Sequence, residues 1–150
     1  DLNVARRKPV NQTSTWGNFG AELAVDGNSD PYFDTGKSCT AAQVQNELEP
    51  TWSVNLEKGY FVSFIKIYNR KNENENNYEQ RLAYFTVMAY TRDGNAITLY
   101  TDTTGNPGDV IELPLYNTSK PVTNIKISIP RKQNRESPIL TLCEVKVYKA

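Results

Sequence analysis

The chain has 150 residues, and its 17 Lys and Arg residues balance its 17 Asp and Glu residues, so the formal net charge at neutral pH is zero. This balance does not suggest electrostatic capture of nucleic acid or an anionic membrane, and no apolar run approaches the roughly 18 residues of a membrane span. The sequence has no histidine, which excludes Ser-His-Asp and Cys-His active sites and His-based zinc sites of the usual kind. We expect a single domain over residues 1–150 with a substantial core.

The first distinctive stretch is Glu22–Thr40, which is punctuated by three residues that break regular structure: Gly27, Pro31 and Gly36. This density of Gly and Pro predicts a long loop without a regular element. A long loop in a compact domain is usually either functional or disordered. The aromatic residues Tyr32 and Phe33 at its centre and Cys39 near its end favour an ordered loop.

Oxygen-bearing side chains are concentrated in this loop: Asp26, Asn28, Asp30, Asp34 and Ser38. Such oxygens suit calcium, which takes roughly six to eight of them. An EF-hand is not indicated, because the sixth position is Pro31 instead of Gly and the twelfth is Lys37 instead of Glu. A site could instead combine Asp26 and Asn28 with main-chain oxygens and Glu144. The alternative is that these side chains only form Asx turns.

Alternation of apolar and polar residues recurs along the chain, whereas no helical period of 3.6 appears. It occurs in four segments: Trp52–Leu56, Ile65–Ile67, Ile125–Ile129 and Cys143–Val147. Phe85–Tyr90 and Ile97–Tyr100 flank Arg92–Asn95, whose Asp-Gly pair predicts a hairpin. We therefore predict an all-β, antiparallel β-sandwich or jelly roll. Three segments are not expected to form strands: Glu22–Thr40, Ala41–Pro50 and Lys71–Gln80.

Arg70 and Arg81 bracket the polar segment Lys71–Gln80, each at the end or start of a predicted strand. Guanidinium groups in fixed positions can hold two vicinal oxygens of a neutral sugar. An aromatic ring could cover the apolar patch of that sugar, and the candidates are Tyr32, Phe33 and Tyr78. The alternative is that both arginines are solvated or paired with a neighbouring Glu. No sequence feature selects two carboxylates to flank a scissile bond, so we do not expect an enzyme.

The two cysteines, Cys39 and Cys143, are too few for a structural zinc site. They either form a disulfide that closes a loop of about 100 residues and adds about 4–5 kcal/mol, or remain two buried thiols. Glycosylation sequons at Asn11 and Asn117 fit a secreted protein. The chain opens without a charged-then-apolar leader, as a mature or excised domain would.

Five groups of residues, spread almost from end to end, form a recognisable pattern: Asn3–Pro9 with Gln12–Thr15, Ala24–Asn28 with Ser38–Thr40, Pro50–Leu56, Tyr68–Arg70 with Arg81–Val87, and Leu142–Val145. This pattern resembles the F-type lectins, or fucolectins, a branch of the discoidin-like galactose-binding folds. The resemblance implies a calcium ion bound by the side chains of Asp26, Asn28, Ser38 and Glu144 and the main-chain oxygens of Leu23 and Cys143. It also implies a Cys39–Cys143 disulfide.

The sugar site departs from the motif of these lectins, in which a His, an Arg-x-Asp and a second basic residue grip L-fucose. Ala41 stands at the position of the His and Asn72 at that of the Asp, whereas Arg70 and Arg81 are retained. Losing one polar partner of a small site can cost about 1–3 kcal/mol. The resemblance implies a sugar site whose members are Arg70, Arg81, Tyr32, Phe33, Tyr78 and Asn72.

Together these observations predict a secreted, calcium-stabilised, non-catalytic lectin domain for fucose-type glycans. An alternative keeps the scaffold but not the monosaccharide site, and uses the remodelled loops as a surface for a protein partner or for adhesion. A further alternative is an accessory module of a larger enzyme or toxin.

Overall fold

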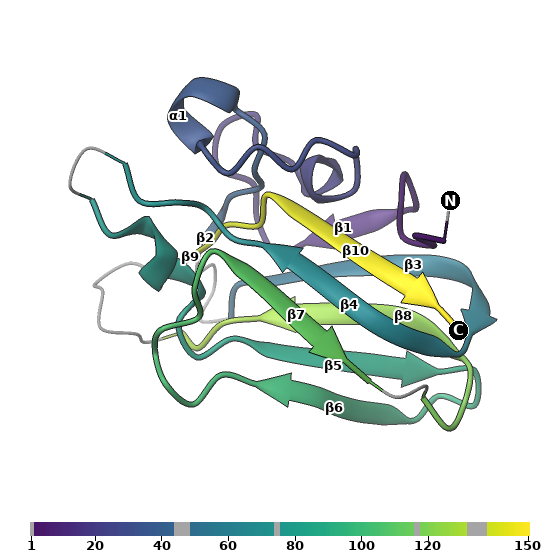
Figure 1. Cartoon of the computed structure of the whole chain (residues 1–150). Coiled ribbons are helices and arrows are strands. Elements are labelled where there is room, and N and C mark those ends of the chain that lie inside the picture. Colours follow the sequence, from purple (N-terminus) through teal and green to yellow (C-terminus); the bar gives the residue numbers. More distant parts are fainter. Residues whose placement is uncertain (1, 44–48, 74–75, 116–117, 132–137) are drawn as a thin grey trace.

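The computed structural model describes residues 2–43, 49–73, 76–115, 118–131 and 138–150. Within them the chain forms ten strands and three short helices (Figure 1). The helices are the 3₁₀ turns η1 (Ala21–Ala24) and η2 (Tyr78–Leu82) and the single α-turn α1 (Phe33–Gly36). None of the helices in this described part is long and apolar enough to cross a membrane.

The strands make three antiparallel sheets. The largest has the order β1 (Val10–Gln12), β3 (Thr51–Tyr60), β8 (Val122–Ser128), β5 (Thr86–Thr91) and β6 (Ala96–Thr101). The second has the order β10 (Glu144–Lys149), β4 (Val62–Tyr68) and β7 (Val110–Pro114), and the third pairs β2 (Ala42–Gln43) with β9 (Ile139–Leu140). Figure 1 shows the three-stranded sheet lying across the five-stranded one. The predicted all-β antiparallel sandwich is confirmed.

The core between the two larger sheets follows the alternation seen in the sequence. Trp52 and Val54 of β3 are fully buried, as are Ile125 and Ile127 of β8, which lie opposite them in register. Ser53, the residue between the two buried side chains of β3, is partly exposed. Each strand therefore places its apolar residues on one face because successive side chains of a strand point to opposite sides.

Two predictions about regular structure were wrong. The loop Glu22–Thr40 contains part of η1 and all of α1, where Gly36 N donates to the Tyr32 carbonyl over 2.7 Å. The segment Ala41–Pro50 contains β2, a strand of two residues. One helical turn or two strand residues are too short to show a period of 3.6 or 2, so neither pattern could appear in the sequence.

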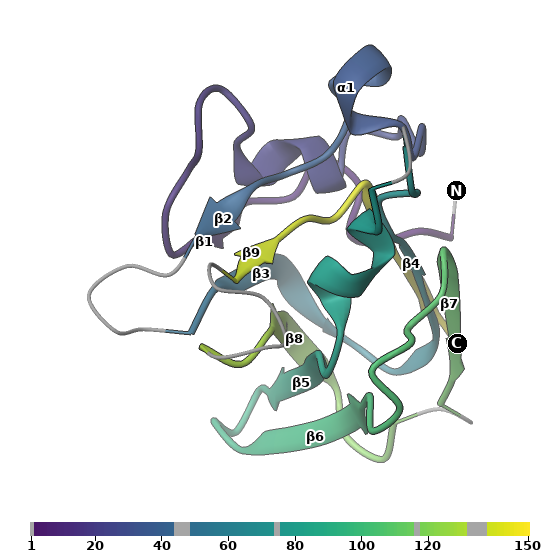
Figure 2. The same cartoon turned by 90° about the vertical axis from the view of Figure 1, so that its left-hand side faces the viewer.

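A smaller apolar cluster lies at the end of the sandwich that carries α1, β2 and β9, which Figure 2 shows from the front. Phe33, Cys39, Ala41 and Cys143 are buried in it. Cys39 and Cys143 form a disulfide across a sequence separation of 104 residues. The predicted disulfide is confirmed, and it ties the long loop to the start of β10.

The sequence predicts glycosylation sites at Asn11 and Asn117. Asn11 lies in β1 and is exposed. Asn117 lies outside the described residues.

Candidate functional site

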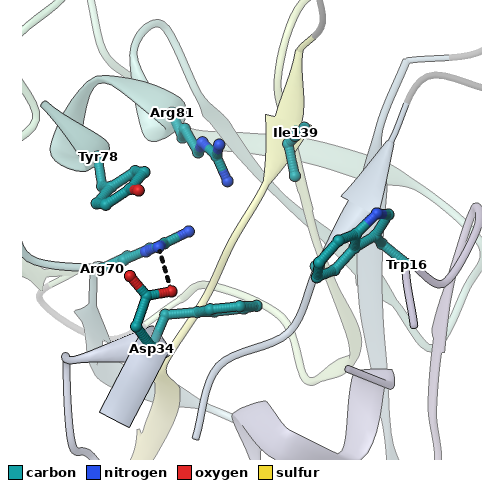
Figure 3. A pocket seen from close by; sticks show the side chains of 8 residues that line it. Trp16, Asp34, Arg70, Tyr78, Arg81 and Ile139 are labelled. Carbon is teal, nitrogen blue, oxygen red and sulfur yellow. Dashed lines mark hydrogen bonds and ion pairs between the residues drawn. The ribbon is translucent and has the colours of Figure 1, made fainter. Parts of the chain in front are cut away.

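A pocket of about 260 Å³ opens at the end of the sandwich that carries α1 and η2. Figure 3 shows Arg70, Arg81 and Tyr78 on one side, with Asp34 beside Arg70, and Trp16 and Ile139 on the other. Phe33 and Ala41 complete its lining. These residues come from segments far apart in the sequence, and the sandwich brings them to one place.

Arg70 is the best-fixed side chain of this pocket. It follows β4, and only 3% of its surface is exposed. Its guanidinium carbon lies 4.3 Å from the ring centroid of Phe33 and 3.4 Å from that of Tyr78, and Nη2 donates to Asp34 Oδ1 over 3.3 Å. Burial lowers the Arg70 pKa, and the neighbouring Tyr78, Asp34 and Glu73 oppose that effect. Two rings and a carboxylate thus hold the guanidinium in one orientation.

Arg81 reaches the pocket from η2, and not from the start of a strand as the sequence suggested. The next strand, β5, begins only at Thr86, because the Phe85 main-chain N donates to the Leu82 carbonyl and closes a turn in between. The Arg81 guanidinium carbon lies 5.0 Å from the ring centroid of Tyr78. The ring of Tyr78 is therefore close to both arginines, and the two guanidinium groups face the same cavity (Figure 3).

Two residues of the predicted sugar set are not among the described residues that line this pocket. Tyr32 is 42% exposed, and its ring centroid lies 5.9 Å from Lys71 Nζ. The side chain of Asn72 accepts a hydrogen bond from the Glu79 main-chain N over 2.9 Å and so holds together the two ends of the polar loop. The carboxylate beside Arg70 is supplied by Asp34 of α1, from a different loop.

Sequence reasoning did not find Trp16 and Ile139, and it considered Asp34 only among the oxygens of the loop. The Trp16 ring is 51% exposed and stacks on Phe19, with centroids 5.5 Å apart and ring planes at 12°. The signal that could have found it is the aromatic pair Trp16 and Phe19 on either side of Gly17, whose positive φ of 58° makes a tight turn.

A second cluster of polar groups surrounds Glu144 at the start of β10. Glu144 is fully buried, and its Oε2 accepts from the Gly27 main-chain N over 2.9 Å. Its Oε1 has no hydrogen-bond partner among the described residues. Burial raises the Glu144 pKa to about 8, and the nearby Asp26 carboxylate adds to the rise. A cation bound beside Glu144 and Asp26 would stabilise the ionised form of the buried Glu144 carboxyl group and would give its unpartnered oxygen a ligand.

The other predicted calcium ligands lie around the same loop. Asp26 Oδ1 accepts from Asn28 N over 2.9 Å, and Asn28 Oδ1 accepts from Asp30 N over 3.1 Å, so both side chains form Asx turns. Whether they also bind an ion stays a prediction. Ser38 Oγ donates to the Asp30 carbonyl. Leu23 belongs to η1, and Cys143 is buried next to Glu144.

The donor chemistry around Glu144 fits a hard cation better than a soft one. Within the residues that the structure describes, no three His, Cys, Asp or Glu side chains come together as a metal cluster. A cation here would therefore need amide, hydroxyl and main-chain oxygens in addition to Asp26 and Glu144. Calcium accepts such a mixed set of oxygens, so the residues present fit the predicted ion.

Comparison with known proteins places these features in a family. The family model of the NedA-like galactose-binding domain, of the F5/F8 type C class, matches residues 23–127. A fucose-binding module from Streptococcus pneumoniae is 26% identical, with 99% of this chain and 98% of that chain covered and a TM-score of 0.78. The lectin domain of lectinolysin, solved in complex with Lewis B antigen, is 28% identical, with 99% and 96% covered and a TM-score of 0.80.

A fucolectin from the serum of the striped bass Morone saxatilis has a similar fold. It is 22% identical, with a TM-score of 0.73, and the match covers 99% of this chain and 47% of the fish protein. No curated protein sequence matches the chain significantly. These likenesses confirm the discoidin-like fucolectin fold that the sequence motifs predicted.

Proposed function

Since the chain belongs to the family of NedA-like galactose-binding domains, we propose that it is a non-catalytic lectin module that binds fucose-type glycans in the pocket between α1 and η2. Its fold is that of carbohydrate-binding modules, and two proteins with this fold are a fucose-binding module and a lectin domain solved with Lewis B antigen. The glycan preference of this chain is inferred from those relatives and from its own pocket.

The observation that carries the proposal is the pair of arginines beside one tyrosine ring. Arg70 and Arg81 lie 3.4 Å and 5.0 Å from the Tyr78 ring centroid, measured from their guanidinium carbons, and both line the pocket. Planar guanidinium groups donate to neighbouring sugar hydroxyls, and Asp34 supplies an acceptor for a hydroxyl proton. Because Arg70 is already held by Phe33 and Asp34, little side-chain entropy is lost when a sugar binds.

The lining of the pocket also supports a binding role without catalysis. Among the described residues that line it, Asp34 is the only carboxylate, and it is paired with Arg70. Glycoside hydrolysis normally uses two carboxyl groups on either side of the scissile bond. The lining of the pocket therefore suits carbohydrate binding better than glycoside hydrolysis.

We further propose that calcium stabilises the loop that forms one side of the pocket. Glu144 and Asp26 would hold the ion through carboxylate oxygens, with Asn28, Ser38 and main-chain oxygens as further ligands. When bound, the ion supplies positive charge next to the Glu144 carboxylate, in addition to that of Lys146 and Arg6. The same loop carries Phe33 and Asp34, so an ordered loop keeps Arg70 in position.

Secretion is part of the same proposal. The disulfide between Cys39 and Cys143 is of the kind that forms and persists outside the reducing cytosol. Glycans on cell surfaces or secreted proteins would then be within reach of the pocket.

Isothermal titration of L-fucose, and then of D-galactose, into the calcium-loaded protein tests the proposal. We expect saturable binding that weakens by at least about tenfold, equivalent to about 1.4 kcal/mol, in Arg70→Ala and in Arg81→Met. Arg81→Met is included because Arg70 is buried and its removal could disturb folding, which thermal unfolding would reveal. Arg92→Ala, an exposed arginine in the β5–β6 turn, is the matched control and should bind as the unmodified protein does.

Binding that survives both pocket substitutions would contradict the proposal. If the folded, calcium-loaded protein binds no monosaccharide and no glycan on an array, the second candidate function is favoured, which is a surface for a protein partner. The observation behind that alternative is Ala41, which leaves the pocket without the side chain that the resemblance predicts there.

A further inference from the structure

A small cavity of about 60 Å³ lies beside Glu144, and its lining residues are Asn3, Arg6, Gly27, Glu144, Lys146 and Tyr148. This lining brings two basic side chains, Arg6 and Lys146, to the carboxylate for which we propose calcium. It shares no residue with the pocket between α1 and η2. The two basic side chains therefore bear on the ion and not directly on the sugar.

Lys146 approaches Glu144 along β10. It follows Glu144 by two residues, so the two side chains lie on the same face of the strand. Tyr68 of β4 lies opposite Glu144 in register, and Lys146 Nζ lies 5.4 Å from the ring centroid of Tyr68. The ammonium group therefore leans along the strand toward Glu144.

Arg6 reaches the same carboxylate from the N-terminal segment. The Arg7 main-chain N donates to the Val25 carbonyl over 2.8 Å, which ties this segment to the loop. The Arg6 guanidinium packs on Gly27, because a Cβ added at Gly27 would lie 2.9 Å from Arg6 Cζ. Gly27 N in turn donates to Glu144 Oε2 over 2.9 Å. The Arg6 side chain is exposed, so water screens much of its charge.

The charges of these two residues are not neutralised by another ion pair. Lys66, a third lysine on this face of the sheet, is paired with Glu112 over 3.7 Å. No carboxylate of the described residues forms such a pair with Lys146 or Arg6. The acidic groups of the proposed calcium site are thus the ones that these two cations face.

The Glu144 carboxyl group responds to both cations, but neither occupies its second oxygen. Burial raises the Glu144 pKa to about 8 and Asp26 adds to the rise, whereas Lys146 and Arg6 oppose it. Glu144 Oε1 nevertheless has no hydrogen-bond partner among the described residues. The place of an ion therefore stays open, while the two cations offset the charge of Glu144 and Asp26 that would attract it.

We propose that Lys146 and Arg6 limit the affinity of the calcium site to a Kd of roughly 0.1–1 mM, because they repel the ion that Glu144 and Asp26 attract. Calcium sites are tuned by the net charge around them, and extracellular modules have affinities in this range. Such a site is filled where calcium is millimolar and largely empty where it is micromolar. This inference rests on the proposed calcium site and adds the residues that limit it.

Isothermal titration of calcium chloride into metal-free protein tests the inference, at a pH above the Glu144 pKa so that the carboxylate is ionised. Lys146→Met, which keeps the aliphatic stem, should bind calcium about fivefold more tightly, and Arg6→Gln about twofold because Arg6 is exposed. Lys146→Arg keeps the charge and should bind as the unmodified protein does. Lys149→Met removes a positive charge from the exposed end of the same strand; this matched control should leave the affinity unchanged.

Unchanged calcium affinity in Lys146→Met would overturn the inference, and so would a Kd below about 10 µM in the unmodified protein. Equal tightening in Lys149→Met would also overturn it, because net charge and not the neighbouring cation would then set the affinity. The rise of the thermal midpoint with added calcium gives the affinities independently and shows that each variant is folded.

The result also separates this inference from carbohydrate binding. If no variant binds calcium while L-fucose still binds, the inference and the proposed calcium site are overturned and the sugar site is not. If calcium binds with the expected order of affinities while no sugar binds, the inference is supported and the proposed lectin function is overturned.

Discussion

Each end of the sandwich has an ion pair between a basic side chain and a carboxylate, but the two pairs differ in their exposure to solvent. At the pocket end Arg70 Nη2 lies 3.3 Å from Asp34 Oδ1, and the Arg70 side chain is 4% exposed. At the opposite end Lys120 Nζ lies 2.8 Å from Asp93 Oδ2, and the two side chains are 53% and 47% exposed. The shorter pair is the more hydrated one. Because water screens an exposed pair, burial and not distance decides which pair matters more.

Carboxyl groups at the two ends also shift their pKa values in opposite directions. Burial raises the Glu144 pKa to about 8. Hydrogen bonds from Lys120 and Thr91 lower the Asp93 pKa in the β5–β6 turn. The first group lacks a partner for one oxygen, whereas the second has several donors around it. One end of the molecule therefore has a buried carboxyl oxygen without a hydrogen-bond partner among the described residues, and at the other end the carboxylate is surrounded by donors.

The contacts at the two ends differ in range along the chain as well. The disulfide at the pocket end joins residues 104 positions apart, and the Asp34–Arg70 pair joins residues 36 apart. The hydrogen bonds of Asp93 within its own turn span only two residues, and its ion pair with Lys120 spans 27. A pocket assembled from distant segments depends on such long-range ties, whereas a hairpin turn holds itself together.

The largest expected effect comes from removing the disulfide. Cys39→Ser combined with Cys143→Ser should lower the free energy of unfolding by about 4–5 kcal/mol, because the unfolded chain regains the entropy of an open loop. Urea unfolding of the double variant and of the unmodified protein measures the difference. A loss below about 1 kcal/mol would mean that the pocket end does not depend on this long-range tie.

The next effect concerns the pH dependence of stability. The Glu144 pKa is about 8 in the folded protein against a usual value of 4.5, so between these values the folded state binds more protons than the unfolded state. In calcium-free protein the stability should therefore fall as the pH rises through this window, by about 1.4 kcal/mol per unit. Urea unfolding in EDTA across roughly pH 5 to 8 measures the slope.

Glu144→Gln is the matched control for that slope, since its side chain does not titrate. The variant should lose most of the fall in stability with pH, and added calcium should reverse the fall in the unmodified protein by stabilising the ionised carboxylate. The same pH slope in both proteins would show that the buried carboxylate at the pocket end is not what titrates.

Much of the fold could be predicted from the sequence because a strand with one buried face shows alternating apolar and polar residues. Trp52 and Val54 alternate with polar neighbours, and both are fully buried. The choice between Tyr32 and Phe33 could not be made in this way. They are adjacent in the sequence, and the α1 turn buries Phe33 to 7% exposure while Tyr32 stays 42% exposed.

Part of the candidate site was predicted from the sequence: Phe33 and the group of Arg70, Tyr78 and Arg81 all line the pocket. Arg70 and Arg81 bracket one polar segment, and both line the pocket. Trp16, Asp34 and Ile139 reach the same pocket from three other segments, and no periodic pattern links them to the arginines. These residues come together because of how the loops pack at one end of the sandwich, and local sequence patterns do not reveal that packing.

The smallest effects come from testing the two ion pairs themselves. Asp34→Asn should lower the free energy of unfolding by roughly 1 kcal/mol, because it leaves the buried Arg70 with a weaker partner, although half of Asp34 is in water. Lys120→Met, which keeps the aliphatic stem, should change the thermal midpoint by no measurable amount, since both partners are exposed and many such pairs contribute nothing measurable. Thermal unfolding at about 0.15 M salt compares the two. Equal losses of stability in the two variants would show that burial does not make one ion pair more important than the other. A loss of stability confined to Asp34→Asn, together with weaker sugar binding, would show that the Asp34–Arg70 pair positions Arg70.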